Sequence, residues 1–218
     1  GYQWIQKDAE DAIAFFHECL HHSEGSTASE LFILQPWQQS VVANLFGWKR
    51  ADNPGIRRYR EMFAYIPRGN GKTFLVAGIA AYIFFCDPEP GQQDFIAAGE
   101  REQAGYLFRQ LKGMVQQEPS LMSRCRIYGG NAQAGQSKSL VREEDGSFLR
   151  VVASDGDTQH GGNTHLAVID EVHVQKNREL FEAFRTSMAK KNRLQPLLIG
   201  ITTADFERES LCNEWYGR

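Results

Sequence analysis

The sequence has 218 residues, of which 42% are hydrophobic and 23% are charged, a balance typical of one globular domain with a substantial core. The formal net charge is −3, which excludes a protein that coats nucleic acid with a broad basic face. Any contact with nucleic acid must therefore be confined to small patches or shared among several copies of the chain.

The cysteines and the apolar runs indicate the compartment. Cys19, Cys86, Cys125 and Cys212 are far apart and show no CxxC spacing. With no signal-like start, this predicts free thiols in a reducing cytoplasm. The longest apolar run, residues 74–86, is shorter than the roughly 20 residues that cross a bilayer, so it predicts a buried helix.

The amino-terminal region, residues 1–22, is predicted to form an amphipathic helix because apolar residues recur at helical spacing. His17, His21 and His22 cluster towards its end, where a metal site is conceivable. No carboxylate or cysteine completes a ligand set with them, so a solvated helix face is the favoured interpretation. A loop over 22–29 is expected to follow.

The rest of the chain predicts an α/β fold. A short helix is expected over 36–46 and a turn at 53–55. Beyond residue 61, strands are expected at 62–66, 94–99, 165–170 and 196–202, and helices at 72–85, 102–117 and 177–191. This alternation predicts a mainly parallel sheet covered by helices on both faces. Residues 120–153, interrupted by glycine turns, are expected to form a β-rich insertion or an antiparallel edge.

A glycine-rich loop, Pro67-Arg68-Gly69-Asn70-Gly71-Lys72-Thr73, lies between the first of these strands and the following helix. Glycines let backbone N–H groups turn inward and cradle phosphate oxygens, and the helix dipole adds to the attraction. Lys72 is expected to reach the β- and γ-phosphates, and Thr73 to bind Mg²⁺. The usual pattern starts with a glycine where Ile66 stands, so a turn that merely begins a helix remains the alternative for this motif alone.

The strand predicted at 165–170 runs into the pair Asp170-Glu171. In nucleotide hydrolysis such a pair divides two roles: Asp170 would hold Mg²⁺ directly or through water, and Glu171 would polarise the attacking water. An exposed acidic strand end is the alternative, although the preceding phosphate loop favours the functional interpretation. His173 completes Asp-Glu-Val-His, which resembles the signature of DExH helicases, and it has no partners for metal binding.

Thr202 and Thr203 end the last predicted strand, at the edge where open α/β sheets bind their ligands. Their hydroxyls would sense the γ-phosphate or contact Glu171 and pass the change to a moving element. A threonine pair selected for β-propensity is the alternative. The order of the three motifs favours a coupling role.

With these motifs the chain resembles the large terminase subunits of tailed bacteriophages over nearly its whole length. Residues 34–38 and 43–48 look like the family's adenine-recognition segment, in which Gln38 would hydrogen-bond the adenine edge. A capped amphipathic helix is the alternative there. Residues 67–73 are similar to the family's deviant Walker A loop, and the match implies that Arg68 stabilises charge at the γ-phosphate.

The same resemblance matches Asp170 and Glu171 to the Walker B aspartate and the catalytic glutamate, and residues 202–204 to the coupling motif. It implies a RecA-like P-loop fold of the additional-strand, catalytic-glutamate branch. One motor domain would span 1–218, with an amino-terminal helical and adenine-recognition segment at 1–60 and the P-loop core at 61–218. The nuclease domain of the family should come next and is absent, so DNA cleavage is not expected.

The function implied by the resemblance is hydrolysis of ATP, with Mg²⁺, to drive double-stranded viral DNA into a procapsid. The implied partners are the DNA, the portal protein, the small terminase subunit and further copies of the chain in a ring, expected to be a pentamer on the capsid. The implied location is the host bacterial cytoplasm and transiently the procapsid portal, with no membrane.

The resemblance assigns neither a trans-acting arginine nor a DNA-contact surface. Some branches carry an arginine in the loop before Walker B that acts on a neighbouring subunit's ATP, whereas His160 stands there in this chain. Arg101 is a weak substitute, and the trans-acting residue is left unassigned. The clusters Lys190, Lys191 and Arg193, and Arg57, Arg58 and Arg60, are candidate DNA contacts, although solvated faces are the commoner explanation.

Two other functions remain open from the sequence. The Asp-Glu-Val-His motif and the upstream glutamine suit a fragment of a superfamily-two helicase, but such enzymes need a second motor lobe that this chain does not reach. A nucleotide-gated docking module that binds ATP and barely hydrolyses it is the other alternative, and Glu171 argues against it.

Overall fold

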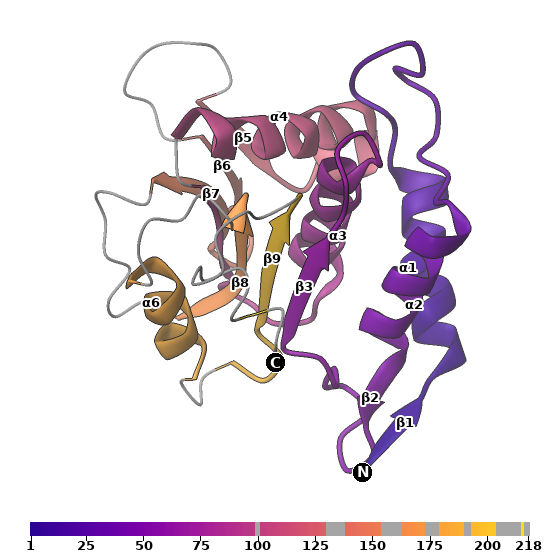
Figure 1. Ribbon diagram of the computed structural model, residues 1–218, viewed down its shortest axis with the longest axis vertical. Coiled ribbons are helices and arrows are strands. Elements are labelled where there is room, and N and C mark those ends of the chain that lie inside the picture. The colour runs from indigo at the N-terminus through magenta and orange to yellow at the C-terminus, as the bar shows by residue number, and fades with distance from the viewer. Residues whose placement is uncertain are drawn as a thin grey trace.

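The computed structural model describes residues 1–98, 101–129, 138–153, 163–172, 179–189, 193–203 and 215. They form a seven-stranded sheet in the order β3-β9-β8-β4-β7-β6-β5 (Figure 1). The strands are β3 (Glu61–Tyr65), β4 (Gln93–Ala98), β5 (Arg126–Tyr128), β6 (Ser139–Arg142), β7 (Ser147–Ala153), β8 (Thr164–Asp170) and β9 (Leu197–Thr202). The five strands from β3 to β7 in this order are parallel, and β6 and β5 continue the sheet antiparallel. The predicted mainly parallel sheet is confirmed, and the uncertain region 120–153 supplies its antiparallel edge.

The position of β9 confirms the branch of the fold. It lies between β3, which leads into the glycine-rich loop, and β8, which ends in the acidic pair. Because β3, β9 and β8 are mutually parallel, their carboxyl ends meet at one edge of the sheet. All seven residues of β8 and all six of β9 are buried, as their continuous apolar runs predict.

Helices cover both faces of the sheet. They are α1 (Gln6–Cys19), α2 (Pro36–Gly47), α3 (Lys72–Cys86), α4 (Arg101–Gln117), α5 (Pro119–Met122) and α6 (Glu179–Met188). One core joins α1–α4 to one face, and a second core joins α6 and Trp215 to the other. Along β8, Leu166 and Val168 enter the first core, while Ala167 and Ile169 enter the second, because side chains alternate along a strand.

Helix α3 lies between the sheet and the α1–α2 pair (Figure 1). Its residues from Leu75 to Ala81 are all buried, which explains the long apolar run. Gly78, in the middle of α3, lets α1 approach closely, since a Cβ at this position would lie 2.3 Å from the Phe16 ring. No helix within the described ranges has the length and apolar character of a membrane span.

The helix predicted over 1–22 is wrong at both ends. Residues Tyr2–Trp4 form β1, which pairs antiparallel with β2 (Trp48–Arg50), and α1 ends at Cys19. The apolar periodicity describes α1 alone, because the strand pairing at its start depends on a segment over 40 residues away.

The three histidines do not form the predicted solvated helix face, because α1 ends at Cys19 and His21 forms an isolated bridge with Leu31 beyond it. His17 Nε2 accepts a hydrogen bond from the Leu34 N–H at 3.0 Å, and His22 packs against the rings of Phe32 and Phe74. Both histidines therefore attach the 20–34 loop to the core. Within the described part of the chain, no group of three or more His, Cys, Asp or Glu side chains is arranged to hold a metal ion.

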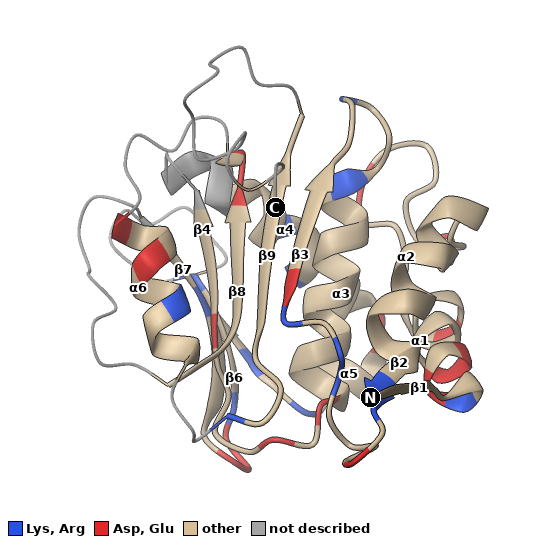
Figure 2. Cartoon of the chain, turned by 60° about the horizontal axis from the view of Figure 1, so that its bottom comes forward, with Lys and Arg blue, Asp and Glu red and all other residues tan. Residues whose placement is uncertain are grey.

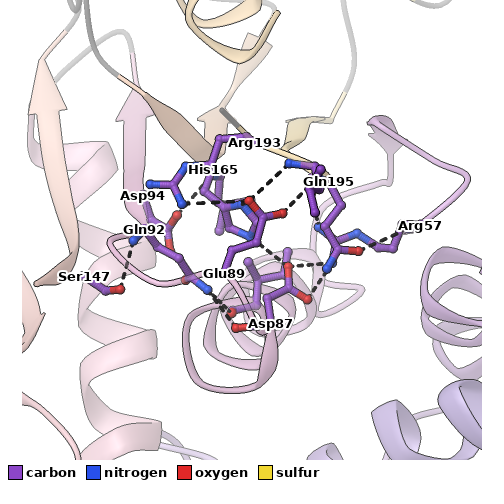
Figure 3. A network of polar contacts seen from close by, with 12 residues as sticks. Arg57, Asp87, Glu89, Gln92, Asp94, Ser147, His165, Arg193 and Gln195 are labelled. Atoms are coloured by element: carbon purple, nitrogen blue, oxygen red, sulfur yellow. Dashed lines mark hydrogen bonds and ion pairs between the residues drawn. The ribbon is translucent and has the colours of Figure 1, made fainter. Parts of the chain in front are cut away.

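A buried polar network closes the amino-terminal end of the sheet (Figure 3). Arg57, 1% exposed, donates from Nη1 to both carboxylate oxygens of Asp87, at 2.7 and 2.6 Å. His165, fully buried at the start of β8, bonds the same carboxylate through Nε2 at 2.8 Å. The candidate DNA contact at Arg57 is therefore wrong, because this guanidinium is committed to an internal ion pair.

Arg193 belongs to the same region. It donates to the carbonyl oxygens of Asn163, Pro90 and Gly91 and is 7% exposed. It thus fixes the segment entering β9 to the loop before β4, so Arg193 is neither a candidate DNA contact nor part of a solvated face. Lys190 and Lys191 lie outside the described residues.

Candidate functional site

The glycine-rich loop joins β3 to α3 with two left-handed residues, Gly69 (φ 82°) and Gly71 (φ 72°). Side chains rarely adopt this conformation, so glycine is required at both turns. Gly71 is the N-cap of α3 and leaves the first turn of a 15-residue helix without a side-chain cap. Its free N–H groups and the positive end of the helix dipole form an anion site.

The loop tolerates Ile66 in place of the usual first glycine. The Ile66 N–H donates to the Thr202 carbonyl at 3.1 Å, so this position continues the β3–β9 ladder and its side chain packs on the core. Asn70 braces the turn, with Nδ2 donating to the carbonyls of Pro67 and Arg68 at 3.2 and 3.3 Å. A phosphate-binding turn therefore forms without that glycine.

The acidic pair lies opposite the start of α3. Asp170 is the last residue of β8, and Glu171 follows in a left-handed conformation (φ 49°) that is unusual for a residue with a side chain. Asp170 Oδ1 accepts from the Glu171 N–H at 2.8 Å. Glu171 Oε1 in turn lies 2.8 Å from Lys72 Nζ. The two motifs that the sequence places far apart are therefore in direct contact.

The electrostatics of the pair suit a divalent cation. Burial and the adjacent Glu171 charge raise the pKa of Asp170 to about 6, and Lys72 opposes them only in part. A buried carboxylate with excess negative charge gains most from a cation with oxygen preference, which Mg²⁺ has. Asp170 and Thr73 line the same pocket and carry the oxygen ligands that Mg²⁺ prefers, so the residues present fit this ion.

A pocket of about 540 Å³ unites these residues. Seven of the predicted site residues line it: Arg68, Gly69, Gly71, Lys72, Thr73, Asp170 and Glu171. Its volume lies within the usual range of small-molecule sites. Tyr106 on α4 and Phe74 also line it, and the sequence analysis missed both. Tyr106 reaches the pocket because β4, which precedes α4, pairs with β8, a neighbour relation that no local pattern signals.

Gln38 lies behind the loop. It occupies the third position of α2, where its Oε1 accepts from the Gln35 N–H at 2.9 Å in a capping box. Its Nε2 faces Gly71, since a Cβ on that glycine would lie 3.4 Å away. A second cleft of about 460 Å³ runs along α2 and β3 with Trp37, Tyr59 and Tyr65 in its walls. The capped helix that the sequence left as an alternative is thus present beside the phosphate loop.

Thr202 and Thr203 lie at the same edge. Thr202 ends β9 opposite Tyr65 of β3 and is fully buried, and Thr203 is 7% exposed. Through the bond from Ile66, the Thr202 backbone contacts the residue immediately before the phosphate loop. His160 and His173 lie outside the described residues, and of Arg101 only the backbone is described.

Comparisons with known proteins agree with this geometry. The family model described as "Terminase large subunit, ATPase domain" matches residues 36–218. The chain belongs to that family.

The relatives of this terminase ATPase domain include two phage proteins. It is 27% identical over 210 residues to the large terminase subunit of Enterobacteria phage HK97, covering 94% of this chain and 38% of the relative. It is 24% identical over 187 residues to the terminase large subunit of Lactococcus phage SK1, covering 84% and 33%. The chain therefore spans well under half the length of these relatives.

The crystal structure of the HK97 large terminase superposes with a TM-score of 0.72 at 27% identity, over 95% of this chain and 40% of that one. The terminase ATPase fold is therefore RecA-like, as expected, and nucleotide binding follows from the family. Family membership favours the terminase interpretation over a helicase fragment.

Proposed function

We propose that this terminase ATPase domain hydrolyses ATP to drive double-stranded viral DNA into a procapsid. One observation carries the hydrolytic part of the proposal: Lys72 of the phosphate loop, Asp170 and Glu171 share a single pocket at the amino-terminal end of α3. A cation, a metal-binding carboxylate and a general base at a phosphate cradle are the parts that phosphoryl transfer to water requires.

The proposed roles follow from position. The amides of 69–73 and Lys72 hold the phosphates. Thr73 and Asp170 would hold Mg²⁺, which would offset the charge of the phosphates. Lys72 leaves Glu171 for the phosphates, and the freed carboxylate then polarises the attacking water. Arg68, exposed at the loop tip, donates to the γ-phosphate as negative charge develops there.

The adenine base is proposed to bind on the α2 side of the loop. Gln38 presents its Nε2 next to Gly71, and the neighbouring cleft along α2 and β3 has the aromatic walls Trp37 and Tyr59. An aromatic cleft with few polar groups suits a purine ring. Pro67 and Asn70 shape the turn between this cleft and the phosphate pocket.

The coupling role of Thr202 and Thr203 is proposed from the bond that joins the two strands. Because the Thr202 carbonyl holds Ile66, immediately before the phosphate loop, a shift of that loop on hydrolysis would move β9 and the segment beyond it. The proposed assembly is a ring, expected to be a pentamer, on the capsid portal, with the small terminase subunit as a further partner in the host cytoplasm.

The test is Mg²⁺-dependent ATP hydrolysis measured against protein concentration, with Glu171→Gln as the blank. A specific rate that rises with concentration supports neighbours that complete the site in trans, as a ring motor requires. A constant rate that the blank lacks supports hydrolysis with Arg68 acting within one chain. No rate above the blank at any concentration contradicts the proposal and favours the docking module.

A further inference from the structure

A second polar pocket lies at the end of β3 opposite the phosphate loop. It has a volume of about 500 Å³ and is lined by Gly1, Tyr2, Arg50, Asp52, Ile56, Arg57, Arg58 and Arg60. We call it the arginine pocket. The phosphate loop follows the carboxyl end of β3, whereas Arg57–Arg60 precede its amino end, so the strand's length of roughly 16 Å separates the two sites. In Figure 2 the segment entering β3 is blue and lies beside the amino terminus.

The arginine pocket carries uncompensated positive charge. Four arginines face one carboxylate in its lining. Asp52 pairs with Arg50, and Arg57 pairs with Asp87 inside the molecule. Arg58 and Arg60 form no ion pair with any carboxylate in the described ranges. Partial burial and the positive neighbours Arg57 and Arg50 lower the pKa of Arg60, and the Glu89 charge opposes them only in part.

The guanidinium groups are held in place before any ligand arrives. Arg58 stacks on Tyr2, Tyr59 and Trp48, with its Cζ atom 4.7, 5.1 and 5.5 Å from the ring centroids. Arg60 donates from Nη1 to the Leu194 carbonyl. Long arginine side chains lose much rotamer entropy on binding, so this stacking reduces the cost of fixing them on an anion.

Arg57 forms the buried wall of the pocket. Arg57 binds Asp87 and Gln195 through its terminal nitrogens, but its Nε has no hydrogen-bond partner among the described residues. Because Arg57 is committed to Asp87 inside the molecule, the donors left for a bound anion are the exposed Arg58 and Arg60. A single phosphate group supplies oxygens for several such donors at once.

We infer that the arginine pocket binds a phosphate group of a nucleic-acid backbone. Guanidinium forks match phosphate oxygens without reading sequence, which is the contact that a protein moving along DNA can repeat. The adjacent rings of Tyr2 and Trp4 are 55% and 39% exposed, and aromatic rings beside arginines suit sugar and base surfaces better than a carboxylate side chain. The choice of nucleic acid as the partner rests on the proposed function.

The site also agrees with the charge of the chain. A net charge of −3 excludes a broad basic face, and the arginine pocket confines positive charge to one small region. It lies away from the phosphate loop, so nucleic acid bound there would leave the nucleotide pocket open.

The experiment compares Arg58→Gln/Arg60→Gln with Lys7→Gln/Arg126→Gln, which removes the same charge from exposed ion pairs on α1 and β5. Binding of a fluorescent 30-base-pair duplex is followed by anisotropy at several salt concentrations. The pocket variant is expected to weaken binding about tenfold or more at low salt and to reduce the slope of log Kd against log salt by about two, while the control changes neither beyond about twofold.

Two further readouts separate the possible failures. ATP hydrolysis without DNA is expected to be unchanged in the pocket variant, so a fault in the proposed hydrolysis would appear in the wild type as well. If the double variant has a lowered Tm, Arg60→Gln alone, which loses one backbone contact, is compared instead. Equal duplex binding by wild type, pocket variant and control would overturn the inference. So would arginine-dependent binding of poly-glutamate without duplex binding, which would assign the pocket to an acidic protein.

Discussion

Lys72 Nζ lies 2.8 Å from Glu171 Oε1, a contact between residues 99 positions apart. The side chains are only 11% and 21% exposed, so the ion pair is largely shielded from solvent. In this arrangement the phosphate-loop cation and the proposed general base neutralise one another. If Glu171 is the general base, as proposed, nucleotide phosphates must draw Lys72 away before Glu171 can act on water, so nucleotide binding and activation of the base would be linked.

Glu171→Gln tests that link. Removing the carboxylate frees Lys72 for the phosphates, so nucleotide affinity is expected to be equal or higher. Loss of a general base is expected to lower the hydrolysis rate by about 100- to 10,000-fold. Fluorescent-nucleotide titration and single-turnover hydrolysis measure the two effects. Glu144→Gln, on an exposed turn, is the matched control and should behave as wild type. A marked loss of affinity in Glu171→Gln would contradict the linkage.

Arg68→Ala is expected to lower kcat by about a thousandfold or more, because a guanidinium that offsets transition-state charge contributes this much in related reactions. Nucleotide affinity should change little, since Arg68 is exposed at the loop tip and the amides and Lys72 hold the phosphates. Steady-state hydrolysis with a separate binding titration measures both. Arg126→Gln, which removes an exposed arginine from β5, is the control. Hydrolysis at the wild-type rate would remove Arg68 from the site.

Gly78→Ala tests the packing of α1 against α3. A Cβ at this position would lie 2.3 Å from Cε1 of Phe16 in the core. Alanine gains about 1 kcal/mol of helix propensity, but overpacking costs about 1–3 kcal/mol, so net destabilisation is expected. Urea unfolding measures the change. In a Phe16→Leu background the substitution should cost less, because the smaller side chain leaves room. An equal cost in both backgrounds would exclude the contact as the cause.

The buried carboxyl groups of Asp94 and Asp87 are expected to affect the pH dependence of stability in opposite directions. Complete burial raises the pKa of Asp94 to about 7, although His165 opposes it. In the unfolded chain the Asp94 carboxyl loses its proton near pH 3.9, whereas in the folded state it keeps the proton up to about pH 7. Because the folded state binds more protons in this range, the contribution of Asp94 to stability falls as the pH rises from about 4 to 7. Asp94→Asn keeps an acceptor for the Leu166 N–H and cannot ionise. At pH 8 the variant is expected to raise the free energy of unfolding, by at most about 4 kcal/mol, and the Tm should rise with it. At pH 5 little change is expected in either quantity.

Asp87→Asn provides the contrast. Burial disfavours its charge, but Arg57 and His165 outweigh burial and hold the pKa of Asp87 below the usual range. The stability it contributes is therefore present above about pH 4 and is lost only at more acid pH. The variant leaves Arg57 buried without its counterion and should lose about 3–5 kcal/mol at neutral pH. Thermal unfolding of both variants is measured from pH 5 to 8. If both variants shifted the Tm at pH 8 in the same direction relative to wild type, the opposite roles given to the two carboxylates would be refuted.

Sequence patterns determined the features whose cause is local. The glycine-rich loop, the apolar run of α3 and the acidic end of β8 each depend on neighbours a few residues away, and they were predicted at nearly the observed bounds. The family was also recognisable, because its motifs occur in a fixed order along the chain.

Only the tertiary structure decided which distant groups meet. The contact of Lys72 with Glu171 requires β9 to lie between β3 and β8 with all three strands parallel. The same packing buries Arg57 and Arg193 and leaves Arg58 and Arg60 exposed. No pattern in the sequence distinguishes the buried arginines from the exposed ones. Residue type and periodicity determine the preference of a segment for helix or strand. The neighbour of each charge depends on strand order and on burial, which many segments determine together.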